Sequence, residues 1–199
     1  MLKRFQPIYR HRGWGDGSGP GSAPAGLAPY LEFLEQVLRE TQPARVLDLG
    51  CGYFAPYAGV DWGDALYTGI ELVPECVAAN QDFAGPRRKF IRGDWSRIKR
   101  LPRADLVLCK DVLQHWSDAD IRRGLRRLAR YPRVLITNSV ATREGGPLNS
   151  DIPTGGYRPL NLLKKPWSLK TNLKKTYAVT TNPGDTKLMF LWEPAAEAQ

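Results

Sequence analysis

Residues 46–52 read Val-Leu-Asp-Leu-Gly-Cys-Gly, an apolar run that ends in two closely spaced glycines. The run is long enough for a short buried strand, and we predict a strand over 45–49. Glycines directly after a strand permit a tight turn and let the backbone approach a ligand closely. This stretch therefore predicts the first strand of an α/β fold, with a binding site at the strand's carboxyl end.

Outward from this stretch, short apolar runs alternate with helical patterns. Nearly continuous apolar strands separated by helices indicate a mostly parallel, doubly wound sheet that is covered on both faces. Ser117 and Asp120 form an S-x-x-D capping box, which predicts the start of one helix. The further strands are expected at 66–72, 89–92, 104–109 and 133–137, and the helices at 30–40, 73–80 and after Ser117.

The carboxyl-terminal part follows a different pattern. Two strand-like runs, 176–181 and 187–192, flank the turn-forming residues 182–185 and predict an antiparallel hairpin. Before them, residues 139–175 form a long connection without a regular pattern, and such connections often cover a substrate. We therefore divide the chain into a Gly-rich flap or leader (1–29) and a single domain (30–199) that contains the covering insertion 139–175.

Composition excludes several classes of protein. The chain has 199 residues, and none of its apolar runs approaches the roughly 20 residues that a membrane-spanning helix needs. The basic amino terminus is followed by a Gly-rich stretch rather than an apolar signal region, which predicts a cytoplasmic protein. Three cysteines without a C-x-x-C spacing predict neither a zinc site nor a disulfide framework.

The net charge of +9 is concentrated in one segment. Residues 87–133 hold fifteen Lys and Arg against five Asp and Glu, whereas the remaining residues are almost neutral. A basic block is typical of proteins that bind nucleic acid, an anionic substrate or an acidic partner. Seven of these cations precede or begin the predicted strands, at the sheet edge opposite the glycine turn, and four more lie on the helix expected after Ser117. The placement favours a solvated rear surface or a docking patch for an acidic protein partner.

Three acids follow or end the first three strands, at the edge where ligands bind in open parallel sheets. Residues 50–55 also satisfy the G-x-G-x-x-A pattern of dinucleotide sites, but Asp48 would repel a pyrophosphate and favours a ligand with cationic groups. Glu71 is placed to accept two ribose hydroxyls. Asp94 is placed to accept from an adenine amino group, with Trp95 as a flanking apolar surface.

The sequence resembles the class I S-adenosylmethionine-dependent methyltransferases, of a small bacterial type. The resemblance rests on VLDLGCG (46–52), GIEL (69–72), RGDW (92–95), ADLVLCKDVLQHW (104–116) and VLIT (134–137). It implies a Rossmann-like, seven-stranded sheet and S-adenosyl-L-methionine as cofactor, with S-adenosyl-L-homocysteine as product. The expected cofactor-binding residues are Asp48, Gly50, Cys51, Gly52, Glu71, Leu72, Gly93, Asp94, Trp95 and Lys110.

Candidate catalytic residues follow the fourth strand. His115 titrates near neutrality and is a candidate general base, and Asp111 lies directly at the strand end. Lys110 is also a candidate to hold an anionic substrate. The expected substrate contacts are Trp14, His115, Tyr157 and Arg158.

We therefore expect a methyltransferase that acts on an O or N atom of a small polar or anionic molecule, such as a sugar, a nucleotide or another metabolite. The alternatives are a methyltransferase for RNA or another nucleic acid and a non-catalytic S-adenosylmethionine-binding protein. For ribose chemistry, Lys110, Asp111, Lys164 or Lys165, and Glu193 would supply a Lys/Asp/Lys/Glu set. An NAD-dependent oxidoreductase is disfavoured by Asp48.

Overall fold

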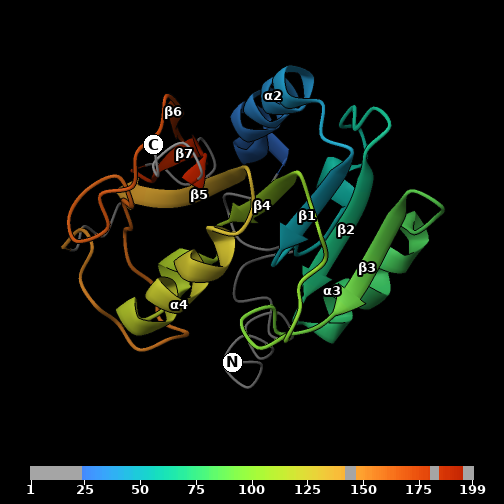
Figure 1. The fold of residues 1–199 in the computed structure, drawn as a ribbon. Helices are drawn as coiled ribbons and strands as arrows, with labels where there is room; N and C mark the ends of the chain where they lie inside the picture. The colour runs from blue at the N-terminus through green and yellow to red at the C-terminus, as the bar shows by residue number, and fades with distance from the viewer. Residues whose placement is uncertain (1–23, 142–146, 180–183, 195–199) are drawn as a thin grey trace.

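A computed structural model describes residues 24–141, 147–179 and 184–194 and contains one seven-stranded sheet (Figure 1). The strand order is β3-β2-β1-β4-β5-β7-β6, and the first five strands are parallel to one another. β7 is antiparallel to both of its neighbours. The strands are β1 (Arg45–Leu49), β2 (Leu66–Glu71), β3 (Arg88–Arg92), β4 (Leu106–Lys110), β5 (Val134–Ala141), β6 (Leu173–Ala178) and β7 (Thr186–Trp192).

Helices cover both faces of the sheet, as the sequence predicts. Alternate residues of β4 face opposite ways: Leu106 and Leu108 pack with α2, whereas Val107 packs with α4. The described helices are α2 (Pro24–Thr41), α3 (Pro74–Asn80) and α4 (Asp118–Leu128), with short 3₁₀ turns η2 (Ala55–Tyr57), η3 (Gln81–Phe83) and η4 (Leu113–His115). None of the helices in the described ranges is long and apolar enough to cross a membrane. The predicted doubly wound fold with a closing hairpin is confirmed.

The first described helix begins earlier than the sequence predicts. α2 starts at Pro24 rather than at Tyr30, and Pro29 lies inside it. Leu27, in this added part, is fully buried in the core. Burial of Leu27 in the core outweighs the weak helical pattern of the Gly- and Pro-rich sequence. The expected boundary between 29 and 30 is therefore misplaced, and residues 1–23 lie outside the described residues.

The strand order reverses between β1 and β4. From β1 the chain moves outward to β2 and β3, and it returns to the other side of β1 with β4. The pairing of Asp48 with both Gly69 and Leu108 brings the carboxyl ends of β1, β2 and β4 together. In open α/β sheets, ligands bind in the crevice outside such a reversal. The predicted acids therefore lie at the edge where a ligand is expected.

Candidate active site

The glycine turn after β1 has the backbone conformation that its sequence predicts. Gly50 and Gly52 have φ values of +76° and +57°, in the left-handed region that favours glycine. A Cβ atom on Gly50 would lie 2.6 Å from Cγ2 of Val112, in the segment after β4. The backbone NH of Gly50 donates to the carbonyl oxygen of Ile70 at 2.8 Å. The turn is thus packed tightly between the segments that follow β2 and β4.

Asp48 is a nearly buried carboxylate at the end of β1, with 5% of its surface exposed. The hydroxyl of Tyr67 donates to its Oδ2 atom at 2.8 Å. Burial raises the pKa of Asp48 to about 7, although the bond from Tyr67 opposes the shift. A buried anion is costly unless a cation compensates it. A cationic ligand group beside Asp48 would supply that compensation.

Glu71 connects three backbone groups around the glycine turn. Its Oε2 atom accepts from the NH of Gly52 at 2.9 Å. Its Oε1 atom accepts from the NH groups of Leu72 and Val73 at 2.6 and 2.8 Å. Burial raises the pKa of Glu71, and the three hydrogen bonds oppose that shift. Since a carboxylate has about four acceptor positions, the side chain retains capacity for a ligand hydroxyl.

The segment after β3 brings Gly93, Asp94 and Trp95 beside β2 and α4. The NH of Gly93 donates to the carbonyl oxygen of Glu71 at 2.8 Å. Oδ1 of Asp94 accepts from the NH and the hydroxyl of Ser96, and so shapes the local turn. Trp95 is buried and stacks on Trp116 with ring centroids 4.6 Å apart. This placement makes Trp95 a core residue and does not fit the predicted surface beside an adenine ring.

Asp111 lies between two ammonium groups. Its carboxylate accepts from Nζ of Lys110 and from Nζ of Lys187, each at 2.7 Å. Burial alone would raise the pKa of Asp111, but the two lysines outweigh it and lower the pKa below its ordinary value. An acid that stays ionised and already binds two cations is a poor proton acceptor. The structure therefore favours a positioning role for Asp111 over the predicted catalytic one, and Lys110 points to this carboxylate.

Four residues of this cluster are absent from the predicted site residues: Ser139, Tyr177, Asp185 and Lys187. Nζ of Lys187 donates to the hydroxyl of Ser139 at 2.7 Å and lies 3.8 Å from Oδ2 of Asp185. Tyr177 lies opposite Lys187 in the β6–β7 register. Oδ1 of Asp185 and the hydroxyl of Tyr177 are buried without a hydrogen-bond partner in the described part of the chain.

One signal in the sequence marks this cluster. Lys187 shares its strand face with Met189 and Leu191, so a lysine stands where the period-2 pattern requires an apolar residue. Sequence reasoning can therefore identify Lys187 as unusual, although not its partners.

His115 lies in η4, beside the connection that follows β5. Its Nδ1 atom is 2.8 Å from the carbonyl oxygen of Gly156, and its ring centroid is 5.5 Å from that of Tyr157. Because a carbonyl oxygen only accepts, Nδ1 carries the proton and Nε2 the lone pair. Burial lowers the pKa of His115, while the contact with Gly156 opposes the shift. A neutral imidazole with a basic Nε2 atom suits the predicted general base.

Tyr157 and Arg158 are adjacent but differ in their surroundings. Tyr157 is half exposed beside His115. The side chain of Arg158 is 1% exposed and forms an ion pair with Asp118 at 2.7 Å. It also donates to the carbonyl oxygens of Trp116, at 2.9 Å, and of Ser150. Because these interior groups occupy the guanidinium, the placement does not fit the predicted substrate contact of Arg158.

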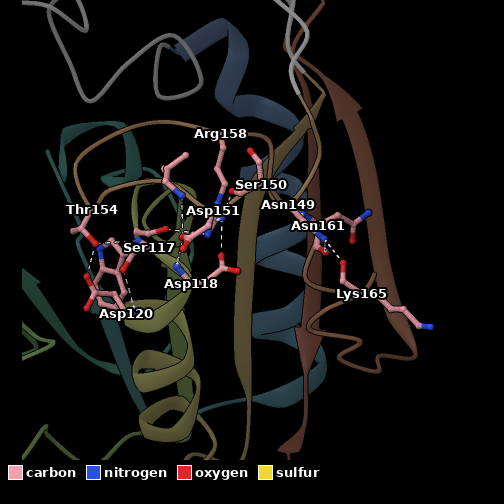
Figure 2. A network of polar contacts seen from close by, with 12 residues as sticks. Ser117, Asp118, Asp120, Asn149, Ser150, Asp151, Thr154, Arg158, Asn161 and Lys165 are labelled. Carbon is pink, nitrogen blue, oxygen red and sulfur yellow. Dashed lines mark hydrogen bonds and ion pairs between the residues drawn. The ribbon is translucent and has the colours of Figure 1, made fainter.

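Figure 2 shows how the connection after β5 is attached to the start of α4. The hydroxyl of Thr154 accepts from the NH of Ser117 at 2.9 Å and donates to Asp120. The predicted capping box is thus only half formed. The Ser117 hydroxyl accepts from the NH of Asp120, but the NH of Ser117 donates to Thr154 and not to the Asp120 carboxylate. Asp151 accepts from the NH of Asp118 at 2.7 Å. The described part of the connection is therefore an ordered segment that lies beside η4 and His115.

Two further predictions can be compared with the structure only in part. Trp14 lies outside the described residues. The three cysteines are free and buried, and the described residues contain no group of His, Cys, Asp or Glu that could hold a metal ion.

Comparison with known proteins relates the first four strands of the chain to methyltransferases. Residues 46–133, somewhat less than half of the chain, match the family model described as a methyltransferase domain. Residues 46–133 thus resemble a methyltransferase domain. Over 99 residues the chain is 35% identical to acetylserotonin O-methyltransferase of Rattus norvegicus. The match covers 43% of this chain and about a quarter (23%) of the length of that curated relative.

Solved methyltransferases share the fold over nearly the whole chain. The N-methyltransferase NodS of Bradyrhizobium japonicum WM9, in complex with S-adenosyl-L-homocysteine, aligns with a TM-score of 0.68 and 13% identity. That alignment covers 96% of this chain and 97% of NodS. The 1,6-didemethyltoxoflavin-N1-methyltransferase of Burkholderia thailandensis aligns with a TM-score of 0.66 and 21% identity, over 96% and 86% of the two chains. At these identities the likeness shows the fold alone.

Proposed function

We propose that the protein transfers a methyl group from S-adenosyl-L-methionine to an O or N atom of a small polar molecule. The observation that carries the proposal is Asp48, a buried acid with a raised pKa at the point where the strand order reverses between β1 and β4. A cofactor with a cationic sulfonium and ammonium would stabilise this carboxylate, whereas a pyrophosphate would repel it. The family match and the shared fold support the same conclusion.

Cofactor binding would use the residues around the glycine turn. Asp48 would accept from the ammonium group, and the acceptor position that remains on Glu71 would take a ribose hydroxyl. The turn at Gly50 and Gly52 lets a ligand approach the backbone without a side chain in the way. The cofactor supplies a methyl group that is already activated by the positive sulfur, so the protein's main tasks are positioning and exclusion of water.

The acceptor molecule would bind beside His115, Tyr157 and the Lys187 cluster. Nε2 of His115 is suited to take the proton that leaves a hydroxyl or ammonium acceptor. Oδ1 of Asp185 and the hydroxyl of Tyr177 are unpartnered within the described residues and would bind polar groups of the acceptor. Asp111 and Asp185 balance the charges of Lys110 and Lys187, which favours a neutral polar acceptor over an anionic one.

The nucleic-acid alternative receives less support. Glu193 forms an ion pair with Arg133 at 3.1 Å, at the amino end of β5, and so cannot join Lys110 and Asp111 in the expected Lys/Asp/Lys/Glu set. A nucleic-acid substrate would also require cations around the crevice, to neutralise phosphates. Four of the basic side chains instead line a hollow at the opposite, amino-terminal edge of the strands.

Calorimetric titration with S-adenosyl-L-homocysteine tests the cofactor assignment. The wild-type protein is expected to bind, and Asp48→Asn and Glu71→Gln are expected to weaken binding at least tenfold. Asp105→Asn is the matched control, because Asp105 accepts from the NH of Arg45 at the opposite end of β1. Absence of wild-type binding, or equal losses in all three variants, would refute the assignment.

Labelled methyl transfer tests the reaction. The protein is incubated with methyl-labelled S-adenosyl-L-methionine and panels of neutral hydroxylated molecules, amines, carboxylates and RNA oligonucleotides. We expect transfer to a small neutral molecule, and a lower kcat with an altered pH profile in His115→Gln. Exclusive labelling of RNA would refute the small-molecule assignment. Cofactor binding without transfer to any panel would favour the non-catalytic alternative.

A further inference from the structure

Within the described residues, one face of β2 and β3 is only partly covered. Parallel sheets are normally buried on both faces, and their strands are correspondingly apolar. Here Leu66 of β2 and Ile91 of β3 expose 45% and 41% of their surfaces. Leu66, Thr68 and Ile70 alternate toward the α4 side of the sheet, and the register places Lys89 and Ile91 on the same side. In Figure 1, α3 lies behind these strands and no described helix crosses in front of them.

The gap arises from the connection between β3 and β4. Residues 93–105 make this crossover without forming a helix. Near the carboxyl edge this segment is anchored by Trp95, which stacks on Trp116. Nearer the amino edge it lies beside the strands without covering them, and a hollow of about 280 Å³ remains. The residues that line the hollow are Arg45, Val46, Leu66, Tyr67, Thr68, Pro86, Arg87, Lys89, Pro102 and Arg103.

The charged side chains that line this hollow have one sign. All of its charged lining residues are basic, and all of them are exposed. Two carboxylates lie nearby but already have partners. Asp64 pairs with Arg87 at 2.5 Å, and Asp105 accepts from the NH of Arg45 at 2.8 Å. The hollow thus combines an apolar floor with a cationic rim.

We propose that this hollow is a docking site for a polypeptide segment that carries both acidic and large apolar side chains. The basic rim complements carboxylates, and the exposed Leu66 would be covered by an apolar side chain. Single-stranded nucleic acid fits less well, because such sites stack bases on exposed aromatic rings. The aromatic residue in the lining, Tyr67, is 2% exposed and belongs to the core. The basic segment noted in the sequence would then serve recognition away from the methyl-transfer edge.

Fluorescence anisotropy in 50 mM NaCl tests this proposal with three labelled polymers of matched length. They are a random copolymer of glutamate and tyrosine, poly-glutamate and poly-uridylate. We expect the copolymer to bind at least tenfold more tightly than either of the others. Lys89→Glu combined with Arg103→Glu is expected to weaken copolymer binding at least tenfold. Leu66→Ser is expected to remove most of the difference in affinity between the copolymer and poly-glutamate.

The control variant combines Arg126→Glu with Lys164→Glu. It changes the net charge by the same amount at exposed positions outside the hollow, and copolymer binding is expected to stay within twofold of wild type. Equal weakening in both charge variants would overturn the proposal, as would tighter binding of poly-uridylate or no copolymer binding. Concentration-dependent dimerisation that Leu66→Ser abolishes would overturn it in favour of a second copy of the chain.

The test is independent of the proposed methyl transfer. The hollow lies at the amino ends of the strands, opposite Asp48, Glu71 and His115. The affinity of Lys89→Glu/Arg103→Glu for S-adenosyl-L-homocysteine is therefore expected to stay within twofold of wild type, which also verifies its folding. If the protein does not bind S-adenosyl-L-homocysteine, a thermal unfolding temperature equal to that of wild type verifies that the variant is folded.

Discussion

At the scale of single residues, Asp48 shows a conflict between stability and binding. The buried carboxyl group has a pKa of about 7, against an ordinary value of 3.8. The folded protein binds a proton on Asp48 more tightly than the unfolded chain does, so protonation of Asp48 stabilises the fold. This contribution to the free energy of unfolding is fully present below about pH 4. It is lost as the pH rises through 7. The residue proposed to hold the cofactor's cation thus weakens the ligand-free fold at neutral and higher pH.

Asp48→Asn is therefore expected to raise the free energy of unfolding at pH 8 by about 1–3 kcal/mol, because the amide has no charge to bury. Near pH 4 to 5, where wild-type Asp48 is protonated, the two proteins should have nearly equal stability. Urea denaturation at both pH values measures the difference. A larger gain at low pH would contradict the raised pKa of Asp48.

Tyr177 permits a second test at this scale. Its buried hydroxyl has no hydrogen-bond partner among the described residues, so Tyr177→Phe removes an unsatisfied group. We expect its thermal stability to equal or exceed that of wild type. Tyr131→Phe is the matched control, since the Tyr131 hydroxyl donates to the carbonyl oxygen of Pro102 at 2.9 Å. Loss of that bond is expected to cost about 1 kcal/mol. A destabilised Tyr177→Phe would instead indicate a structural role for its hydroxyl.

At the scale of elements, short-range patterns predict the strands well. β1 agrees with its predicted residues, and the other strands differ from prediction mainly at their ends. The start of α2 is mispredicted because burial of Leu27 against the sheet is a tertiary effect. Arg158 is misassigned for a similar reason. Nothing in its local sequence shows that Asp118, forty residues earlier, lies beside it.

Arg158 should accordingly contribute to stability more than to substrate binding. Arg158→Met leaves Asp118 and two carbonyl oxygens without their donor and is expected to cost about 3 kcal/mol. Hydrogen exchange should accelerate over residues 149–161. Arg123→Met is the control on α4, the helix that carries Asp118. The Arg123 side chain is 65% exposed, and loss of its ion pair with Asp120 should cost under about 1 kcal/mol. Similar costs in the two variants would argue against the anchoring role.

At the scale of the whole molecule, the fold brings together charges that no spacing in the sequence relates. Asp111 follows β4 and Lys187 belongs to β7, seventy-six residues later. Strand alternation predicts the sheet, and therefore the edge at which Asp48 and Glu71 meet. It does not predict which side chains pair across that edge, because each pairing depends on register and rotamers. The cofactor side was therefore more predictable than the acceptor side.

The three buried cysteines report on the integrity of the whole molecule. Burial raises the pKa of Cys76 to about 12, and it also raises the pKa values of Cys51 and Cys109. The native protein is therefore expected to react with a thiol-specific disulfide reagent at pH 8 only through unfolding. Labelling as a function of urea should follow the unfolding transition seen by circular dichroism. Rapid labelling in the absence of urea would show that the core opens locally.

The contact between Gly50 and Val112 has a consequence for the order in which ligands bind. A Cβ atom on Gly50 would lie only 2.6 Å from Val112, so the backbone of the glycine turn lies directly against the loop that carries Asp111 and His115. A displacement of this turn by one ligand is therefore expected to shift the loop that we propose to contact the other ligand. Thermodynamic linkage requires such a coupling to be reciprocal, so each ligand would change the affinity for the other by the same factor.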